Sequence, residues 1–476
     1  MRLRILVVLL ALATVLYAQS PLSGSATSQL KRDLAALRDA ALSDDYAYQQ
    51  AEHLTDNIGP RATGSPQAEA AVRYVAGELR QLGLQVQLEE VQVPHWIRGV
   101  ETAELAEYPG QAPGTTQKLV LTALGGNSPT PADGLTAEVL VVNNWDELKT
   151  LGRAKAIGRI VLFNVPFDQQ KAAAGLAGEA YGEAVTYRTA GPKAAAQLGA
   201  AACLVRSVGG AQYRIPHTGW SEPAGIPAAA VTSEDAELLA RLTAQGPVRL
   251  HLTLTSQTGP AVTSYNVIGD LKGTEHPEQV VVVSGHLDSW DLGTGAIDDA
   301  AGVAIAMETA QLVQQLHLHP KRTMRVIAWM DEENGGSGRE AYAKDHAAEF
   351  SDHVAAIESD LGASHPLGFQ ARINPSALPA LKPVQEVLQN FGANLIRLTT
   401  FSPGSDIEPL AKAGVPAFGI MTDSRTYFNY HHTAADTLDK IVPQELRENA
   451  GDGSAGLRTC RYAGTVAAVG VPGKDQ

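Results

Sequence analysis

The sequence predicts an α/β fold in which a mostly parallel, mixed sheet is flanked by helices and a second α/β unit is inserted into the chain. Two observations predict it. Downstream of about residue 264, short and almost wholly apolar segments alternate with helical segments, which is the pattern of parallel strands covered on both faces. Upstream, residues 137–256 repeat a similar alternation. A chain of 476 residues has room for two or three domains, at roughly 100–200 residues each.

The mature chain is predicted to begin with two helices and a strand. Residues 28–51 predict a helix with a polar face. In residues 68–82, apolar side chains such as Val72, Val75 and Leu79 recur at helical spacing, which predicts an amphipathic helix. Residues 84–93 then alternate as a strand.

The inserted unit follows stretches rich in Pro, Gly and Thr, and these breaks set the expected domain limits. No concentration of His, Asp and Glu at ligand spacing occurs in residues 137–256, so this domain is predicted to be non-catalytic. Its predicted elements are strands at 137–142, 159–163, 201–205 and 248–254 and a helix at 192–198. The expected division is a signal peptide at 1–18, main-domain parts at 19–124 and 259–476, and the inserted domain at 125–258.

The main sheet is predicted from four apolar strands separated by helices. In the first helix, Ala300, Val303, Ala304 and Met307 lie on one face, as expected for a helix that packs on a sheet. The strands are expected at 280–284, 324–330, 354–357 and 416–421, and the helices at 298–316 and 384–391.

The first 18 residues predict a secretory signal peptide. Arg2 and Arg4 precede an apolar run at 5–17, and the small Ala18 marks the expected cleavage point, as in signal peptides. The run is shorter than the about 20 residues that span a bilayer comfortably. We therefore expect a secreted or periplasmic protein with no membrane association after cleavage.

Charge and cysteine content exclude several classes of function. The net charge of −14 argues against nucleic-acid and anionic-membrane partners, since both require a basic surface. Two cysteines, Cys203 and Cys460, cannot form a disulfide framework or a Cys-based zinc finger, and their pairing is left open. Any metal site must therefore consist mainly of His, Asp and Glu.

Acidic and imidazole side chains follow the predicted strands where those strands end. Ligands of such sheets bind outside the carboxyl ends of the strands, so these side chains are expected to meet at one edge. Singly, each has an ordinary explanation: Asp298 can cap a helix, and His286 can be a core histidine. The segments are 285–290, 298–299, 331–333, 358–362 and 430–433.

Taken together, these side chains predict a metal centre. Carboxylates gathered in one cleft repel each other, and a cation removes that conflict. Imidazole and carboxylate suit Zn2+, with Co2+ or Mn2+ as substitutes. Two divalent ions (+4), three carboxylates (−3) and one bridging hydroxide give a neutral site, and a shared Asp can bridge such ions. The expected ligands are His286, Asp298, Glu333, Asp360 and His432.

Two further carboxylates are assigned roles beside the metals. Asp288 lies two residues from His286, where it is expected to hold the second imidazole nitrogen. Glu332 precedes the expected ligand Glu333. A carboxylate beside a metal-bound water can take its proton and pass it to a leaving amine, so Glu332 is the expected general acid/base.

Five motifs occur in an order that is familiar from one family. They are GHLDSW at 285–290, GAIDD at 295–299, MDEENGG at 330–336, ESD at 358–360 and HHT at 431–433. Together with LTDNIGPR at 54–61, they resemble the di-zinc aminopeptidase and glutamate carboxypeptidase family, and within it a branch of secreted dipeptidases. The resemblance covers nearly all of the mature chain.

The resemblance implies a ligand arrangement. His432 is expected as the ligand rather than His431, because the family ligand precedes a small hydroxylated residue and Thr433 follows here. One zinc would be held by His286 and Asp360 and the other by Glu333 and His432, with Asp298 bridging them.

The resemblance also implies features around the site. The Asp298–Asp299 peptide bond would be cis, and the inserted unit would be a protease-associated domain that covers the site and restricts access to short peptides. A homodimer is expected. The Arg and Lys side chains that the larger carboxypeptidases place around the C-terminal side of the substrate have no match in this sequence.

The sequence thus predicts a secreted dinuclear zinc exopeptidase that hydrolyses dipeptides or short peptides by a metal-bridged hydroxide, with Glu332 as general acid/base. One alternative is an enzyme like the glutaminyl cyclases, which keep one zinc. Another is a non-catalytic, receptor-like binding protein. The filled ligand set and Glu332 favour the peptidase.

Overall fold

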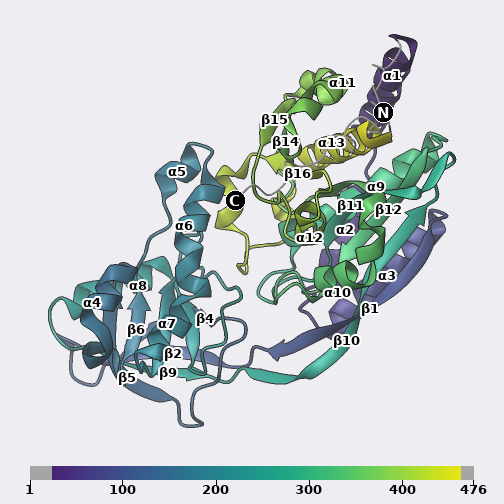
Figure 1. Cartoon of the computed structure of the whole chain (residues 1–476). Coiled ribbons are helices and arrows are strands. Elements are labelled where there is room, and N and C mark those ends of the chain that lie inside the picture. The colour runs from purple at the N-terminus through teal and green to yellow at the C-terminus, as the bar shows by residue number, and fades with distance from the viewer. Residues whose placement is uncertain (1–23, 462–476) are drawn as a thin grey trace, which may run out of the picture.

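The computed structural model describes residues 24–461, with side chains for residues 28–453, and the predicted signal peptide at residues 1–18 lies outside this range. Within this range the chain forms two eight-stranded sheets, which Figure 1 shows as two separate units. Within the described part of the chain, no helix combines the length and the apolar character needed to cross a membrane.

The first sheet has the four predicted apolar strands side by side at its centre. β11 pairs in parallel with β12 and β13, and β13 pairs in parallel with β16. The flanking strands β10 and β14 are antiparallel to β12 and β16, so the sheet is mixed, as predicted. Its spatial order is β1 (Gln85–Ile97), β10 (Gln257–Leu271), β12 (Arg322–Trp329), β11 (His276–His286), β13 (His353–Glu358), β16 (Ala417–Thr422), β14 (Pro366–Arg372) and β15 (Leu395–Leu398).

Both faces of this sheet are covered, which explains its continuous apolar strands. On β11, Val281 and Val283 pack into the core that contains α9, whereas Val280 and Val282 face the opposite core with Tyr342 of α10. The predicted alternation of strands and helices therefore forms a three-layer unit. Its α-helices in the described range are α1 (Gly24–Ala41), α2 (Tyr46–Glu52), α3 (Pro66–Gln81), α9 (Ala301–Gln315), α10 (Ser337–Asp345), α11 (Leu378–Leu388), α12 (Glu408–Lys412) and α13 (Pro443–Arg461).

Three predicted helices have different limits in the structure. The helix expected at 384–391 is α11, which begins at Leu378 and ends at Leu388. The helix expected at 28–51 is interrupted, since α1 ends at Ala41 and α2 begins at Tyr46. The helix expected to begin at Asp298 becomes regular only at Ala301, because Asp298 and Asp299 have non-helical φ angles of −140° and −139°. Asp299 rather than Asp298 accepts a hydrogen bond near the helix start, from the Gly302 N–H at 2.8 Å.

The second sheet forms the inserted unit. Its central strands β5, β6, β7 and β8 are parallel, and Cys203 on β7 is a buried free thiol. Three strands upstream of residue 125 also belong to this sheet. In spatial order the strands are β3 (Gln117–Leu119), β2 (Glu101–Glu107), β9 (Arg249–Leu254), β5 (Leu135–Val142), β6 (Ile160–Phe163), β7 (Ala202–Arg206), β8 (Ala228–Val231) and β4 (Leu121–Ala123). Its helices are α4 (Trp145–Ala156), α5 (Gln169–Ala173), α6 (Ala177–Thr189), α7 (Gly191–Gln197) and α8 (Ser233–Thr243).

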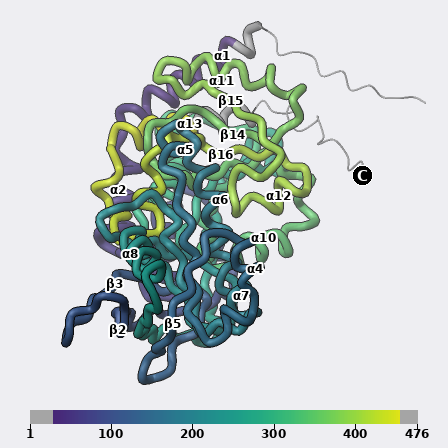
Figure 2. The backbone as a smooth tube through the Cα atoms, turned by 90° about the vertical axis from the view of Figure 1, so that its left-hand side faces the viewer, coloured from purple at the N-terminus to yellow at the C-terminus, as the bar shows by residue number. Residues whose placement is uncertain are grey.

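The chain crosses between the units twice, from β1 to β2 and from β9 to β10. The long antiparallel pair β1–β10 extends from the first sheet toward these crossings, as Figure 1 shows. At the first crossing, Arg98 donates to Asp291 of the first unit (2.6 Å) and to the Ala123 carbonyl of the second (2.9 Å). Helices α5 and α6 extend from the second unit toward the first (Figure 2) and contact residues Ser424–Asn429.

A buried carboxyl group in α9 gives the first unit a pH-dependent stability. Glu308 is fully buried; its Oε2 accepts the Ala47 N–H at 2.9 Å, and its Oε1 has no hydrogen-bond partner among the described residues. Burial raises its pKa to about 8. Because the fold favours the protonated form, this stability is fully present below the unfolded-state pKa, about 4.3, and is lost as pH rises through about 8.

We therefore expect the free energy of unfolding of the native protein to fall between about pH 5 and about pH 9. Glu308→Gln should make this fall smaller by on the order of 1–3 kcal/mol. Chemical denaturation at the two pH values measures this. Glu408→Gln, at an exposed carboxylate on α12, is the control. An unchanged pH dependence in Glu308→Gln would contradict the prediction.

Candidate active site

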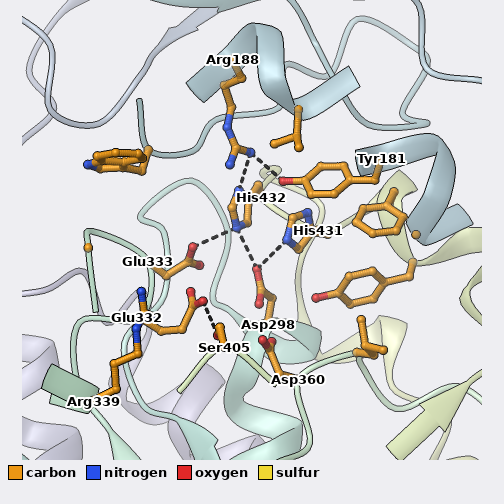
Figure 3. A pocket seen from close by; sticks show the side chains of 17 residues that line it. Tyr181, Arg188, Asp298, Glu332, Glu333, Arg339, Asp360, Ser405, His431 and His432 are labelled. Atoms are coloured by element: carbon orange, nitrogen blue, oxygen red, sulfur yellow. Dashed lines mark hydrogen bonds and ion pairs between the residues drawn. The ribbon is translucent and has the colours of Figure 1, made fainter. Parts of the chain in front are cut away.

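The predicted strand ends meet at one edge of the first sheet, beside a cavity of about 620 Å3 that Asp298, Glu333, Asp360 and His432 help to line. β11 ends at His286, β12 is followed by Glu333, and β13 is followed by Asp360. Asp298 precedes α9, and His432 lies in the loop after Ser424–Asn429. Figure 3 shows Asp298 between His432 and Asp360, with a dashed line to His432.

The five expected ligands form two pairs joined by Asp298. His286 Nε2 lies 3.2 Å from Asp298 Oδ1 and 3.3 Å from Asp360 Oδ1. His432 Nε2 lies 3.2 Å from Asp298 Oδ2 and 2.9 Å from Glu333 Oε2. Asp298 therefore directs one oxygen at each pair, which is the arrangement expected of a bridging carboxylate. Its peptide bond to Asp299 is cis, as the family resemblance implied.

The burial of these side chains fits a cation-binding site. His286, Asp298, Glu333 and His432 are each more than nine-tenths buried. Burial raises the pKa of Glu333 to about 8 and that of Asp360 to about 6. Glu333 Oε1 has no hydrogen-bond partner in the described structure. Buried carboxylates of this kind require a compensating positive charge, and two imidazoles with three carboxylates are donors that suit zinc.

The donor atoms are also close enough to share ions. Those of His286, Asp298 and Glu333 all lie within 4.8 Å of one another, as do those of His286, Asp299 and Asp360. Asp299 Oδ2 accepts the His286 N–H at 3.0 Å and so fixes the backbone of that strand end. The residues present therefore fit a dinuclear centre.

Asp288 makes contacts that differ from the expected one. Its carboxylate lies 3.9 Å from His286 Nδ1, whereas its backbone carbonyl lies 3.0 Å from the same nitrogen. The fully buried carboxylate instead accepts the N–H groups of Asp331 (2.8 Å) and Glu332 (3.1 Å) and the Thr63 hydroxyl (2.9 Å). Asp288 thus orients the His286 imidazole with its main-chain carbonyl. Its side chain orients the loop that precedes Glu333.

Glu332 lines the cavity beside the expected ligands. Its Oε1 accepts a hydrogen bond of 2.6 Å from the Ser405 hydroxyl, which Figure 3 shows. This contact fixes one carboxylate oxygen and leaves Oε2 for the cavity. Ser405 belongs to the loop before α12, so a residue far along the chain positions Glu332.

The two adjacent histidines have different environments. His432 contacts Glu333 and Asp298, whereas His431 Nε2 lies 3.4 Å from Asp298 Oδ2 and its Nδ1 lies 3.1 Å from His217 Nε2. His432 is therefore joined to two expected ligands and His431 to one. The third imidazole, His217, comes from the second unit and is fully buried.

The second unit contributes other contacts that the sequence did not predict. The Thr218 N–H donates to the His432 carbonyl at 2.9 Å, and the Thr218 carbonyl lies 3.3 Å from His432 Nδ1. Arg188 and Tyr181, joined by a hydrogen bond of 2.8 Å, line the cavity from α6. These residues lie in the block without ligand-like spacing, so no local sequence signal marked them.

Comparison with known proteins identifies the family. The model of peptidase family M28 matches residues 266–452. Carboxypeptidase Q of Xenopus laevis is 36% identical over 438 residues, which cover 89% of this chain and 89% of that protein. The chain belongs to peptidase family M28. This confirms the family that the five motifs indicated and the expectation that the chain is a peptidase.

Solved structures of M28 proteins have the same fold. A peptidase M28 precursor from Shewanella amazonensis is 34% identical, with a TM-score of 0.84, and the match covers 94% of this chain and 99% of that one. BSAP, a zinc aminopeptidase from Bacillus subtilis, is 22% identical, with a TM-score of 0.63. The match covers 90% of this chain and 98% of that one. The predicted fold class, a mixed sheet flanked by helices, is thus confirmed.

The contacts of the two histidines generate a prediction about metal binding. We expect His432→Ala to lose about half of the zinc that the native protein holds, because it removes an imidazole from the pair with Glu333. His431→Ala is the matched control and should retain the native zinc content. Metal analysis after dialysis measures both. Loss of zinc from His431→Ala alone would reverse the assignment.

Proposed function

We propose that this M28 chain is a dinuclear zinc exopeptidase that hydrolyses dipeptides or short peptides. The observation that carries the proposal is Asp298, whose two oxygens face two separate pairs of a histidine and a carboxylate. The similarity to carboxypeptidase Q over most of both chains supports peptides as the substrate.

The proposed ligands are those expected from the sequence. His286 and Asp360 would hold one ion, Glu333 and His432 the other, and Asp298 would join them. When bound, the two ions supply Lewis acidity toward water and toward the scissile carbonyl. Co2+ or Mn2+ can substitute in a site of this kind.

Glu332 is proposed to move the proton. With Oε1 held by Ser405 at 2.6 Å, Oε2 takes a proton from the attacking water and delivers it to the nitrogen of the leaving amine. Asp288 positions two residues around this proton transfer. Its carboxylate accepts the Glu332 N–H, and its backbone carbonyl lies beside His286 Nδ1. Glu332 thus transfers the proton, and Asp288 holds the groups around it.

The second unit is proposed to be a protease-associated domain that limits substrate length. Its expected limits are 125–258, between main-domain parts 19–124 and 259–476, and strands β2, β3 and β4 upstream of residue 125 also join its sheet. Tyr181, Arg188 and Trp220 line the same cavity as the expected metal ligands. Its volume of about 620 Å3 lies within the roughly 300–1,000 Å3 of small-ligand sites, which suits a short peptide.

Location and assembly follow from the sequence and the family resemblance. We propose that residues 1–18 direct the protein out of the cytoplasm and are then removed, so that it works as a secreted or periplasmic enzyme with no membrane anchor. Homodimer formation remains a prediction of the resemblance.

Glu332→Gln tests the mechanism. We expect it to lower kcat for dipeptides by roughly 10²–10⁴-fold, because the amide cannot accept the proton, while the zinc content stays native. Amine release from a dipeptide panel measures this with zinc-loaded protein. Glu340→Gln, at an exposed carboxylate in α10, is the matched control. Full activity of Glu332→Gln would disprove the proposed role.

Metal content separates the rival functions. The proposed centre predicts close to two zinc ions per chain and loss of hydrolysis on chelation, restored by zinc. One ion per chain without hydrolysis would instead favour an enzyme like the glutaminyl cyclases. Metal binding without any turnover would favour a receptor-like binding protein.

A further inference from the structure

Two adjacent histidines, His431 and His432, present the same ring nitrogen to the same carboxylate oxygen. Their rings are stacked, with centroids 3.7 Å apart and planes inclined by 17°. His431 Nε2 lies 3.4 Å and His432 Nε2 lies 3.2 Å from Asp298 Oδ2, and Figure 3 draws both contacts. Distance from Asp298 therefore does not decide which of the two imidazoles can be a metal ligand.

The second ring nitrogen, Nδ1, does decide it. An imidazole binds a metal ion through a nitrogen that carries no proton, and it donates its other N–H to a neighbouring acceptor that fixes the tautomer. A neutral ring has one N–H, so a proton on Nδ1 leaves a lone pair on Nε2, and a proton on Nε2 removes that lone pair. The partners of the two Nδ1 atoms therefore show which histidine is prepared to bind an ion.

His432 has an acceptor at Nδ1. The Thr218 carbonyl lies 3.3 Å from this nitrogen, so the proton is on Nδ1, and Nε2 turns its lone pair toward Glu333 at 2.9 Å. Arg188 Nη1 lies 3.2 Å from the same Nδ1, but its two hydrogens have other acceptors in the Tyr181 hydroxyl at 2.8 Å and the Thr218 carbonyl at 3.3 Å. The surroundings thus set His432 as a ligand.

His431 has another imidazole at Nδ1. That ring belongs to His217 of the second unit, whose Nε2 lies 3.1 Å away. His217 is fully buried, which favours its neutral form, and its Nδ1 has no hydrogen-bond partner among the described residues. A proton on that Nδ1 would be a buried N–H without an acceptor, which is rare in proteins. His217 therefore carries its proton on Nε2 and donates it to His431 Nδ1.

The proton of His431 is then on Nε2, the nitrogen that faces Asp298. This nitrogen has no lone pair to offer a metal ion. The two stacked rings are therefore in opposite tautomers, although they are neighbours in sequence and lie against the same carboxylate. Both tautomers are set by consecutive residues of the second unit, His217 and Thr218.

We propose that His217 is a positioning residue that keeps His431 off the metal centre, so that the second unit determines which of the two histidines is the ligand. This inference rests on the proposed metal centre and concerns the choice of its ligand. The alternative is a third ion among His217, His431 and His432, whose donor atoms lie within 4.8 Å of one another. The guanidinium of Arg188 beside His432 opposes a further cation there.

Zinc titration of matched variants tests the proposal. His217→Gln supplies an amide oxygen, which accepts the Nδ1–H of His431 and so frees its Nε2. We expect His217→Gln/His432→Ala to bind the second zinc roughly tenfold more tightly than His432→Ala, as outer-shell partners change metal affinity by about 10–100-fold. His217→Phe/His432→Ala provides no acceptor and should recover less. His251→Phe/His432→Ala, which changes a histidine of β9 in the same unit, is the control.

A third substitution identifies the new ligand. His217→Gln/His431→Ala/His432→Ala should lose the recovered affinity, because His431 is then absent. Equal affinity of His432→Ala and His217→Gln/His432→Ala for the second zinc would overturn the proposal. A third zinc in the native protein that disappears in His217→Phe would also overturn it, in favour of an ion held by the three imidazoles.

NMR of the zinc-loaded native protein tests the same inference without relying on the folding of the double variants. In protein isotopically labelled at its histidine nitrogens, the shifts of Nδ1 and Nε2 report which one carries the proton. We expect the proton on Nε2 in His217 and His431 and on Nδ1 in His432, with signals assigned from the single variants. A proton on Nδ1 of His431 would overturn the proposal.

Failure of this inference and failure of the proposed function have different signatures. If the protein binds zinc and shows the expected tautomers and zinc affinities but hydrolyses no peptide, the proposed function fails and the role of His217 stands. If it hydrolyses dipeptides while His431 carries its proton on Nδ1, the proposed function stands and the role of His217 fails.

Discussion

The centre of this structure depends on one buried carboxylate, Asp298, that faces two histidine–carboxylate pairs. Burial makes it unfavourable to keep three carboxylates so close without cations. The surrounding structure serves to hold them there: parallel strands bring His286, Glu333 and Asp360 to one edge, and Asp299 occupies the helix start so that Asp298 remains free to face the cavity. The architecture of the first unit follows from this requirement.

The sequence predicts this part of the molecule well because its signals are local. Val280–Val283 form a continuous apolar segment since both faces of the sheet are covered, and polar residues appear where such a segment ends. The limits of the helix at Asp298 were less well predicted, because an Asp before a helix resembles a cap and only the hydrogen bonds of Asp299 show which residue is used. Likewise, sequence spacing placed Asp288 near His286 but did not reveal that its carboxylate binds backbone N–H groups instead.

Contacts between distant segments were not predictable in the same way. Ser405 reaches Glu332, and His217 reaches His431, across 73 and 214 positions of sequence. Neither residue belongs to a pattern of spacing, and His217 lies in a block whose composition indicated no chemistry. Strands β14 and β15 were also missed. β14 alternates between buried and partly buried residues, and β15, at the edge of the sheet, is mostly exposed, so neither has a continuous apolar segment.

The contact of Thr218 with His432 has a consequence for how far the side chains of the second unit can vary. Thr218 uses its own N–H and carbonyl for this contact, and every amino acid except proline carries both groups. This contact therefore does not use the Thr218 side chain, whose hydroxyl instead donates to the Ala123 carbonyl at 3.0 Å. The second unit can change its surface side chains while the main-chain groups of Thr218 hold the backbone carbonyl and the imidazole of His432.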